Sequence, residues 1–539
     1  MAHLLSFGIA ALAAQASAIP QVQPLSAPAV LPLASSTGAS IPHSPSFNSF
    51  SFEPAFWVEF FGNLTSPNAL VFRLLDTIHA HGGRPIIRPG GITMDSMIFS
   101  PSAGAPVRTT NANGGVYRTT VGPAYYQSWA NFPQGTQFVS TLNFGNNSLD
   151  IARDLAVASV KYSDSVPLFE LGNEPTNYAR ARWNANTTNY VNQWLDWTRQ
   201  IDSAVNATLV SKSNHSLPST RWFASSATTD KTALNVRPID LIPAGIDRSH
   251  QVADYSMHSY PFSTCDPTRA RRASISNILN HTELTTYADT EIYPSARAAL
   301  AAGSRWIIGE FNSISCSGAP NVTDTFAQAL WVIDTYLIYA TRNASAVYLH
   351  QGATLVFQSS NQVNVPSPDG KPGFSTYSMV FPIDTALRGK ARALPSFLGQ
   401  LFMAEALGVE GTRVVEVKEG ETGERFAAYA LFRPEGGVGK LVLVNSAPWY
   451  GNTTQDGTRK VDVGAYAYAD GKKVWVKRLT APKVDEKDSA KTTWAGQAFP
   501  LGEAVGETVV EEVEGAVVRV RGSEAVLVFF DEEEARRVK

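Results

Sequence analysis

Short apolar runs alternate with longer amphipathic segments over most of the first 408 residues of this 539-residue chain. Eight runs have the length and the composition of buried strands: Phe52–Phe60, Pro85–Gly90, Gln137–Phe144, Val166–Gly172, Arg221–Ser226, Ala253–Tyr260, Trp306–Phe311 and Ala346–His350. Helical patterns lie between and after them, among them Pro67–His81, Leu149–Tyr162, Thr188–Val205, Pro294–Ala302, Thr323–Thr341 and Leu394–Leu407. Because parallel strands need a crossover connection, eight strand–helix units in series predict an α/β fold, a (β/α)8 TIM barrel over residues 46–408.

The chain is longer than one hydrophobic core usually serves, and its pattern changes after residue 408. Short alternating runs such as "RFAAYALFRP", "KLVLVNSAP" and "AVVRVRGSEAVLVFF" are separated by Gly, Pro and Asn. This pattern is typical of an antiparallel β-sandwich with one solvated face, which we predict for residues 409–539. Residues 19–45 are rich in Pro, Ala and Ser, so this segment is either a linker or an extended strand added to the β-domain.

The first twenty residues, "MAHLLSFGIAALAAQASAIP", contain an apolar run of signal-peptide length followed by small residues. They predict a signal peptide over residues 1–18 and a secreted, extracellular protein. Nine Asn-x-Ser/Thr tripeptides agree with a secreted glycoprotein: Asn63, Asn146, Asn186, Asn206, Asn214, Asn280, Asn321, Asn343 and Asn452. The two cysteines, Cys265 and Cys316, follow the sixth and seventh strands, so we expect one disulfide between adjacent loops at the barrel rim.

Several classes of partner and chemistry have no support in the sequence. A formal net charge of -3 offers no general attraction to nucleic acid or to anionic membranes. Two cysteines without a histidine cluster do not make a usual metal site, and no phosphate-binding glycine loop, zinc-protease helix or nucleophile-elbow serine occurs. We therefore expect no cofactor, no metal, no nucleic acid and no membrane partner. The oligomeric state is left open.

Two glutamates stand where the chemistry of such a barrel gathers, at the carboxyl ends of its strands. Glu174 follows the fourth strand in "ELGNEP", and Glu310 ends the seventh in "RWIIGEFNS". One such glutamate alone is more often a salt-bridge or capping residue. Strands four and seven, however, lie across the barrel mouth from one another, and two carboxylates about 5 Å apart are what a retaining glycosidase needs.

The stretches "LFELGNEPTNY", "WIIGEFNS", "DTFAQALWVID" and "RPIIRPGGITMDSMIF" resemble glycoside hydrolase family 79, which contains heparanase and microbial β-glucuronidases. The resemblance spans the barrel and extends to the β-domain. It implies that Glu174 is the general acid/base and Glu310 the nucleophile. It also implies that Asn173 binds the sugar 2-hydroxyl and that Arg88 keeps the nucleophile ionised and oriented.

The same resemblance suggests further substrate-binding residues. Tyr260, in "SMHSYPF", is similar to a family tyrosine that contacts the nucleophile, and His258 on the same face is either a ligand or a hydrogen-bonded barrel histidine. Glu59, in "FWVEFFGN", resembles a sugar-hydroxyl ligand, with a structural salt bridge as the alternative. For the substrate carboxylate, the family implies the loop after strand eight, where Gly373 to Tyr377, with Gln351 at the entrance, could form a backbone nest.

These features predict a glycan-hydrolysing enzyme, a secreted retaining exo-β-glucuronidase that removes terminal glucuronic or 4-O-methylglucuronic acid. An endo-acting, heparanase-like enzyme would need basic clusters along the cleft, and "RARRAS" (residues 269–274) is the only dense one in the barrel. A neutral-sugar β-glycosidase of the same barrel clan is a third possibility, because the carboxylate pair does not report on C6. A non-catalytic glycan-binding glycoprotein is the last, although it would have no need of both glutamates.

Overall fold

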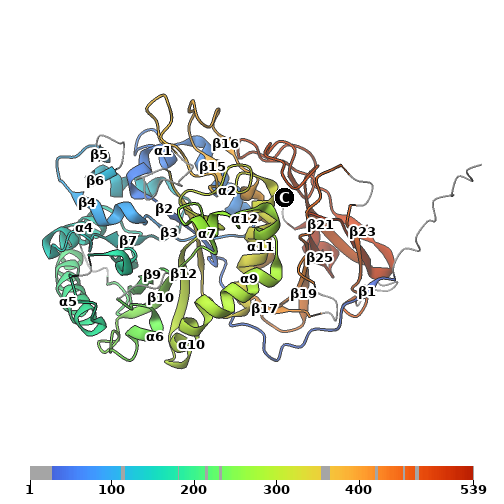
Figure 1. The fold of residues 1–539 in the computed structure, drawn as a ribbon, viewed down its shortest axis with the longest axis horizontal. Coiled ribbons are helices and arrows are strands. Elements are labelled where there is room, and N and C mark those ends of the chain that lie inside the picture. Colours follow the sequence, from blue (N-terminus) through green and yellow to red (C-terminus); the bar gives the residue numbers. More distant parts are fainter. Residues whose placement is uncertain are drawn as a thin grey trace, which may run out of the picture.

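The computed structural model consists of a barrel and a β-rich domain packed side by side (Figure 1). It describes residues 27–110, 116–179, 181–212, 216–229, 234–353, 365–418, 423–452, 456–467 and 473–537. The predicted signal peptide, residues 1–18, lies outside the described residues, and so do parts of the glycosylation tripeptides at Asn214 and Asn452.

Eight parallel strands form the barrel in the order β3-β2-β14-β12-β10-β9-β8-β7. They are β2 (Asn48–Phe52), β3 (Ile87–Arg88), β7 (Val139–Leu142), β8 (Leu168–Leu171), β9 (Trp222–Ala227), β10 (Val252–Ser259), β12 (Arg305–Phe311) and β14 (Val347–Gln351). A parallel bridge between Ile87 and Phe138 joins the two ends of this order, and Ile87 N donates to Gln137 O over 2.9 Å. The predicted TIM barrel is therefore confirmed.

Helices surround this sheet, as the alternation in the sequence predicted. The main ones are α2 (Ala69–Ala80), α4 (Leu149–Tyr162), α5 (Thr187–Ser211), α9 (His281–Tyr287), α10 (Tyr293–Ala301), α11 (Phe326–Thr341) and α12 (Ser396–Leu407). Side chains of Asn68 and Asn186 cap α2 and α5 by accepting bonds from the first free N–H groups. In the part of the chain that the structure describes, no helix has the length and apolar character needed to cross a bilayer.

Shorter elements complete the barrel domain and decorate its mouth. They are η1 (Pro54–Phe56), α1 (Trp57–Phe61), η2 (Ile92–Ser96), β4 (Met97–Phe99), β5 (Val107–Thr110), β6 (Val116–Val121), α3 (Pro123–Gln127), η3 (Ser128–Asn131), η4 (Pro175–Asn177), α6 (Pro238–Leu241), β11 (Phe262–Ser263), α7 (Pro267–Ala270), α8 (Ile275–Ile278), η5 (Ala288–Ile292), β13 (Ile314–Ser315), β15 (Val380–Phe381) and β16 (Arg392–Ala393).

The first strand differs from its prediction. The strand ends at Phe52, and Pro54 opens a helical turn that leads into α1. Proline at the first position of a turn or helix is favoured, because its fixed φ fits and its missing N–H is not needed. The aromatic run that we read as a strand is instead the buried face of a short helix, with Trp57, Phe60 and Phe61 in the core. A short apolar run does not by itself distinguish the two.

The β-domain contains two sheets around a shared core. One has the order β17-β18-β19-β25-β21-β22, with β23 paired to β21, and the other has the order β1-β20-β24. The strands are β1 (Ala29–Val30), β17 (Arg413–Glu416), β18 (Phe426–Phe432), β19 (Val438–Asn445), β20 (Arg459–Asp462), β21 (Val474–Thr480), β22 (Thr493–Trp494), β23 (Glu511–Val513), β24 (Val517–Val520) and β25 (Glu524–Phe529), with η6 (Glu514–Ala516) before β24 and α13 (Glu532–Arg536) after β25. The large sheet is antiparallel, so the predicted β-domain architecture is confirmed. The N-terminal segment adds β1, which pairs in parallel with β20.

Helix α11 is packed between the barrel and the β-domain. All residues of α11 except the last are buried, because the barrel covers one side and the β-domain the other. The residue before this helix, Thr325, makes no side-chain cap bond. The first free N–H groups of α11, on Phe326 and Ala327, donate instead to the carbonyl oxygens of Glu486 and Val484 in the β-domain, over 2.8 and 3.0 Å.

A buried histidine also joins the domains. Nδ1 of His281, on α9, lies 3.0 Å from Asp334 on α11, and Nε2 lies 3.3 Å from Oε1 of Glu416 on β17. Tyr429 of β18 donates to the same Asp334 carboxylate over 2.6 Å. Burial alone would lower the pKa of His281, but the carboxylates of Asp334 and Glu416 raise it to about 10. Because each ring nitrogen faces a carboxylate, the imidazolium is the form that the domain interface holds.

Replacing this histidine should therefore weaken the fold in a pH-dependent way. The folded-state pKa lies above the unfolded value, so the stabilisation is complete below pH 6.5 and is lost as pH rises through about 10. We expect His281→Gln to lower the free energy of unfolding by about 3 kcal/mol at pH 6, and the difference from wild type to shrink toward pH 10. Urea titrations across that range measure it, with the exposed His250→Asn as control. A difference that stays constant with pH would contradict the ion-pair account.

Candidate active site

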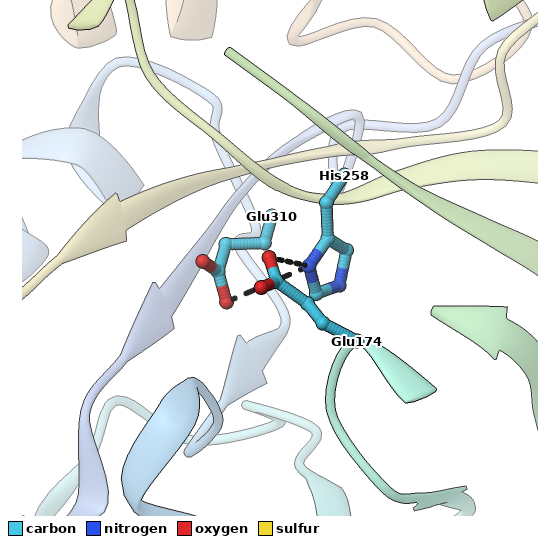
Figure 2. A group of neighbouring side chains, drawn as sticks. All are labelled: Glu174, His258 and Glu310. Carbon is cyan, nitrogen blue, oxygen red and sulfur yellow. Dashed lines mark hydrogen bonds and ion pairs between the residues drawn. The ribbon is translucent and has the colours of Figure 1, made fainter. Parts of the chain in front are cut away.

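A cavity of about 370 Å³ opens at the carboxyl ends of the barrel strands. Its lining includes both predicted catalytic glutamates, together with Asn173, His258, Tyr260 and Tyr377 from the predicted set. Figure 2 shows the carboxylates of Glu174 and Glu310 turned toward one another, with the imidazole of His258 beside them. A carboxylate oxygen of Glu174, one of Glu310 and a ring nitrogen of His258 all lie within 4.8 Å of one another.

The backbone that carries Glu174 is sharply turned. After β8 ends, Gly172 has φ of +85°, and a Cβ there would lie 2.7 Å from the hydroxyl oxygen of Tyr178 and 2.8 Å from Cβ of Phe144. Glu174 itself has φ of 51°, a conformation that is strained for a residue other than glycine. Its N–H donates to the carbonyl of Ser226, on β9, over 3.0 Å. The "GNEP" sequence therefore makes a tight turn that lifts a carboxylate into the cavity.

Asp95 holds this turn in place. One of its oxygens accepts bonds from the N–H groups of Phe144 and Gly145, over 3.2 and 3.1 Å. The other accepts from the N–H of Asn173 over 3.1 Å and from the Tyr178 hydroxyl over 2.5 Å. A carboxylate with four donors is well satisfied in a buried position. The Asp at the end of "RPGGITMD" is thus a clamp for the loop after β8.

Glu310 lies deeper than Glu174 and has different partners. Its side chain is 8% exposed, against 20% for Glu174. Nη1 of Arg88 donates to Oε2 over 3.0 Å, and the hydroxyl of Tyr260 donates to Oε1 over 2.9 Å. Both contacts stabilise the ionised form and fix its orientation, so the pair consists of one fixed carboxylate and one more accessible one.

The electrostatics of Glu310 favour its charged form. Burial alone would raise its pKa, but the charges of His350, His258 and Arg88, together with the Tyr260 hydroxyl, lower it to about 2. Burial lowers the pKa of His350 itself to about 4, so this ring is neutral near pH 7. Arg88 is therefore the group that keeps a positive charge beside Glu310 at neutral pH.

The imidazole of His258 lies near the carboxylates of both Glu174 and Glu310. Its Nδ1 lies 3.0 Å from Oε1 of Glu174 and 4.0 Å from Oε2 of Glu310. These three side chains offer ligand atoms at a spacing that a divalent cation could use. Arg88, however, already neutralises the Glu310 oxygen that would have to bind, and its guanidinium would repel a cation there. The contacts fit a carboxylate pair better than they fit a metal centre.

Other predicted residues lie at different distances from the cavity. Oδ1 of Asn173 accepts from Nη2 of Arg88 over 3.0 Å, which leaves the donor groups of this amide for other partners. Gln351 and Gly373 are buried and are not among the described residues that line the cavity. The Gln351 amide donates to the carbonyl of His350 and accepts from the N–H of Met379, so it fastens the chain after β14 rather than facing a ligand.

Glu59 does not stand at a strand end, and our prediction of a sugar ligand there is wrong. It lies on α1 and pairs with Arg108 over 2.6 Å, which is the salt bridge we gave as the alternative. The residue at the end of the first strand is Glu53, which does line the cavity. Its carboxylate accepts bonds from Ile92 N, Thr93 N and the Thr93 hydroxyl. Gly91, with φ of +139°, permits this approach, since a Cβ there would lie 2.4 Å from Glu53 Oε1.

Sequence reasoning missed three functional candidates: Glu53, Glu170 and His350. His350 lines the cavity and Glu170 contacts Arg88, which also bonds to Glu310. The signal for Glu53 was the proline that follows it, which marks the end of an extended run. Glu170 gave no such signal, because it lies inside the apolar stretch of β8.

The predicted disulfide between Cys265 and Cys316 is confirmed. It joins the segments that follow β11 and β13, which pair in parallel through Phe262 with Ile314 and Ser263 with Ser315. Both cysteines line the cavity. The bridge closes a loop of 51 residues and should contribute about 4 kcal/mol on the chain-entropy account.

Removing the Asp95 clamp should loosen the loop after β8. Asp95→Asn keeps the shape but replaces one acceptor oxygen by an NH₂ group, which would face donors instead of accepting from them. We expect the free energy of unfolding to fall by about 2 kcal/mol, and amide exchange at Asn173 and Gly145 to speed up. Urea titration and hydrogen exchange measure the two effects. The exposed Asp150→Asn serves as control, and unchanged exchange at those amides would contradict the clamp.

Comparison with known proteins points to one family. The family model for the glycosyl hydrolase family 79 C-terminal beta domain matches residues 428–527, and the model for cellulase (glycosyl hydrolase family 5) matches residues 149–349. A β-glucuronidase from Aspergillus niger is 30% identical over 344 residues, which cover 58% of this chain. A β-glucuronidase from Neurospora crassa is 25% identical over 346 residues, covering 60% of this chain. The alignments span 60% of the length of these relatives.

Solved structures share the fold over nearly the whole chain. A 4-O-α-L-rhamnosyl-β-D-glucuronidase from Fusarium oxysporum has a TM-score of 0.74 at 20% identity, covering 93% of this chain and 99% of that one. A family 51 arabinofuranosidase from Xanthomonas axonopodis has a TM-score of 0.56 at 14% identity, covering 91% and 97%. The matched C-terminal domain and the curated relatives agree with the motifs that resemble glycoside hydrolase family 79, and residues 428–527 carry the C-terminal beta domain of that family.

Proposed function

We propose that this protein is a retaining exo-β-glucuronidase that removes terminal β-linked glucuronic or 4-O-methylglucuronic acid from glycans. The observation that carries the proposal is the facing pair of Glu174 and Glu310, whose carboxylate oxygens approach within 4.8 Å across one cavity. Carboxyl groups at roughly 5 Å suit double displacement, because there is no room for a water molecule between the nucleophile and the sugar.

In the first step, an oxygen of Glu310 attacks the anomeric carbon while the glycosidic bond breaks. Glu174 gives its proton to the departing oxygen, and Glu310 becomes a neutral glycosyl ester. Arg88 and Tyr260 keep the attacking carboxylate ionised and aligned before this step. In the second step, Glu174 takes a proton from water, the water oxygen attacks the anomeric carbon, and the bond from that carbon to Glu310 breaks, so that Glu310 leaves as a carboxylate.

His258 and Asn173 support these steps. The contact of 3.0 Å between His258 Nδ1 and Glu174 orients the acid/base in the cavity. Asn173 is held by Arg88 through its Oδ1, so its amide N–H groups are available to the 2-hydroxyl of the sugar, where hydrogen bonds strengthen in the transition state. Glu53, at the end of β2, offers carboxylate oxygens to other hydroxyls of the same ring.

The choice of a uronic acid is supported by the curated relatives, both named β-glucuronidases. Among the described residues that line the cavity, Arg269 is the one arginine, and there is no lysine. A C6 carboxylate would therefore be received mainly by neutral donors, of which the Tyr377 hydroxyl is the foremost. The same scarcity of cations argues against a sulfated polymer as the substrate of an endo-acting enzyme.

Secretion is part of the proposal. The Cys265–Cys316 disulfide fits an oxidising compartment. Asn63, Asn146, Asn206 and Asn321 are exposed, as an attached glycan requires.

A second candidate is a β-glycosidase for neutral sugars. The match of residues 149–349 to a cellulase family favours it, and so does the carboxylate of Asp266 in the lining, since it would repel a charged sugar at close range. The catalytic steps would be the same. The two candidates differ only in what surrounds C6.

A panel of aryl glycosides tests the function. We expect wild type to cleave nitrophenyl β-glucuronide faster than the glucoside, galactoside and xyloside. Glu310→Gln should lose about 10⁴-fold in kcat. Glu174→Gln should lose about 10² to 10⁴-fold on poor leaving groups, and azide should restore its turnover. The buried Glu524→Gln, in the β-domain, is the control. Cleavage of neutral glycosides alone would favour the second candidate, and no cleavage at all would favour a binding protein.

The products separate exo from endo action. With a glycan that ends in β-linked glucuronic acid, we expect single uronic acids to accumulate linearly from the first minutes. Chromatography of the released sugars measures this, and the 4-O-methyl form can be followed in the same run. Early release of longer oligosaccharides with a fast drop in polymer size would contradict exo action.

A further inference from the structure

Glu170 is a buried carboxylate that the proposed steps do not use. It lies on β8, four residues before Glu174, and is 0% exposed inside the barrel. It is not among the described residues that line the cavity, so a sugar would not touch it. Its Oε2 accepts from Nε of Arg88 over 2.5 Å, and its Oε1 accepts from the hydroxyl of Ser226.

Arg88 is thus shared between two carboxylates. Its Nε binds Glu170, its Nη1 binds Glu310 and Ser51, and its Nη2 binds Asn173. Burial alone would lower the pKa of Arg88, but Glu170 and Glu310 raise it above its usual range, so the guanidinium stays charged. If Glu310 were its only carboxylate partner, the buried positive charge of Arg88 would be neutralised by the nucleophile alone.

Formation of the glycosyl ester on Glu310 changes the charge balance around Arg88. In the free enzyme, Arg88 with Glu170 and Glu310 carries a net charge of minus one. When Glu310 forms the ester it loses its charge, and Arg88 with Glu170 is neutral. Without Glu170, the same step would leave a buried cation with no anion. The charge that appears on Glu174 does not replace it, because Glu174 bonds to His258 and Asn177, not to Arg88.

We propose that Glu170 is a positioning residue that compensates Arg88 while Glu310 is esterified, and so favours formation of the glycosyl-enzyme. The inference rests on the proposed double displacement and assigns to it a residue outside the cavity. Glu170 also connects the two catalytic side chains: the hydroxyl of Ser226 donates to it, and the carbonyl of Ser226 accepts the N–H of Glu174.

The other groups around Glu310 do not take this role. Tyr260, His258 and His350 contact Glu310 from β10, from the segment after it and from β14, and none of them has a described bond to Arg88. Glu53, Glu174 and Tyr377 are further titratable groups of the cavity, and none of the three is paired with Arg88 among its described contacts. Glu170 is the carboxylate other than Glu310 that bonds to the guanidinium.

The test separates the two chemical steps. Glu170→Gln has the same shape and can still accept from Arg88, but it lacks the charge. The wild type is first assayed with the aryl glycoside panel, and the 2-deoxy-2-fluoro derivative of the sugar that it cleaves is then used to trap the glycosyl-enzyme. For Glu170→Gln we expect trapping to slow by at least about 10-fold. Reactivation of the trapped enzyme should stay within about 3-fold of the wild-type rate or become faster. Without the charge of Glu170, Arg88 stabilises the departing Glu310 carboxylate more strongly, which makes Glu310 a better leaving group.

The outcomes distinguish this role from general support of the fold. Equal slowing of both steps would mean that Glu170 only holds the structure, and unchanged trapping would mean that it has no role; either result overturns the proposal. Asp254→Asn is the control, because Asp254 is a buried carboxylate at the start of β10 that pairs with Arg305. It should leave the ratio of the two steps unchanged.

Two further arrangements keep the test decisive. If Glu170→Gln does not fold, Glu170→Asp keeps the charge but withdraws it from Arg88, and should slow trapping by less, again without slowing reactivation. If the wild type cleaves no glycoside of the panel, the proposed function fails and the inference fails with it. If it cleaves a neutral glycoside, only the sugar was wrong, and the measurement proceeds with that sugar.

Discussion

The buried guanidinium of Arg88 is the constraint on which the site depends. Its donors reach side chains from β2, β8 and β12 and from the loop after β8, so every one of those elements must be in place before the charge is satisfied. A cation with no exposed surface is costly unless all of its partners are present. The closed parallel barrel supplies that arrangement, since the carboxyl ends of its strands converge on one mouth.

The strained turn at Glu174 follows from the same arrangement. The Glu174 carboxylate enters the cavity within three residues of the end of β8, and Gly172 and the positive φ of Glu174 make that possible. The conformation persists because Asp95 accepts from the N–H of Asn173 and Ser226 accepts from the N–H of Glu174. The strain is thus offset by bonds from neighbouring loops rather than by the turn itself.

The sequence allowed the barrel and the carboxylate pair to be predicted because both depend on order along the chain. Alternation of strands and helices sets the strand number, and the strand number places Glu174 opposite Glu310. Glu59 could not be placed correctly, because an apolar run of five residues reads equally well as a strand or a helix. Gln351 lies one residue beyond the predicted end of the last strand, and only the folded backbone shows that its amide binds Met379. Glu170 was hidden because a buried carboxylate in an apolar strand is recognised only by its partner.

The β-domain belongs to the active site in an indirect way. α11 connects β12, which carries Glu310, to β14, which carries His350, and all residues of this helix except the last are buried. An isolated barrel would leave one face of α11 in water and its first N–H groups without Glu486 and Val484. That exposure would destabilise the helix and, with it, the positions of the two strands that it connects. The C-terminal domain therefore stabilises the position of Glu310 by completing the environment of the helix behind it, although none of its described residues lines the cavity.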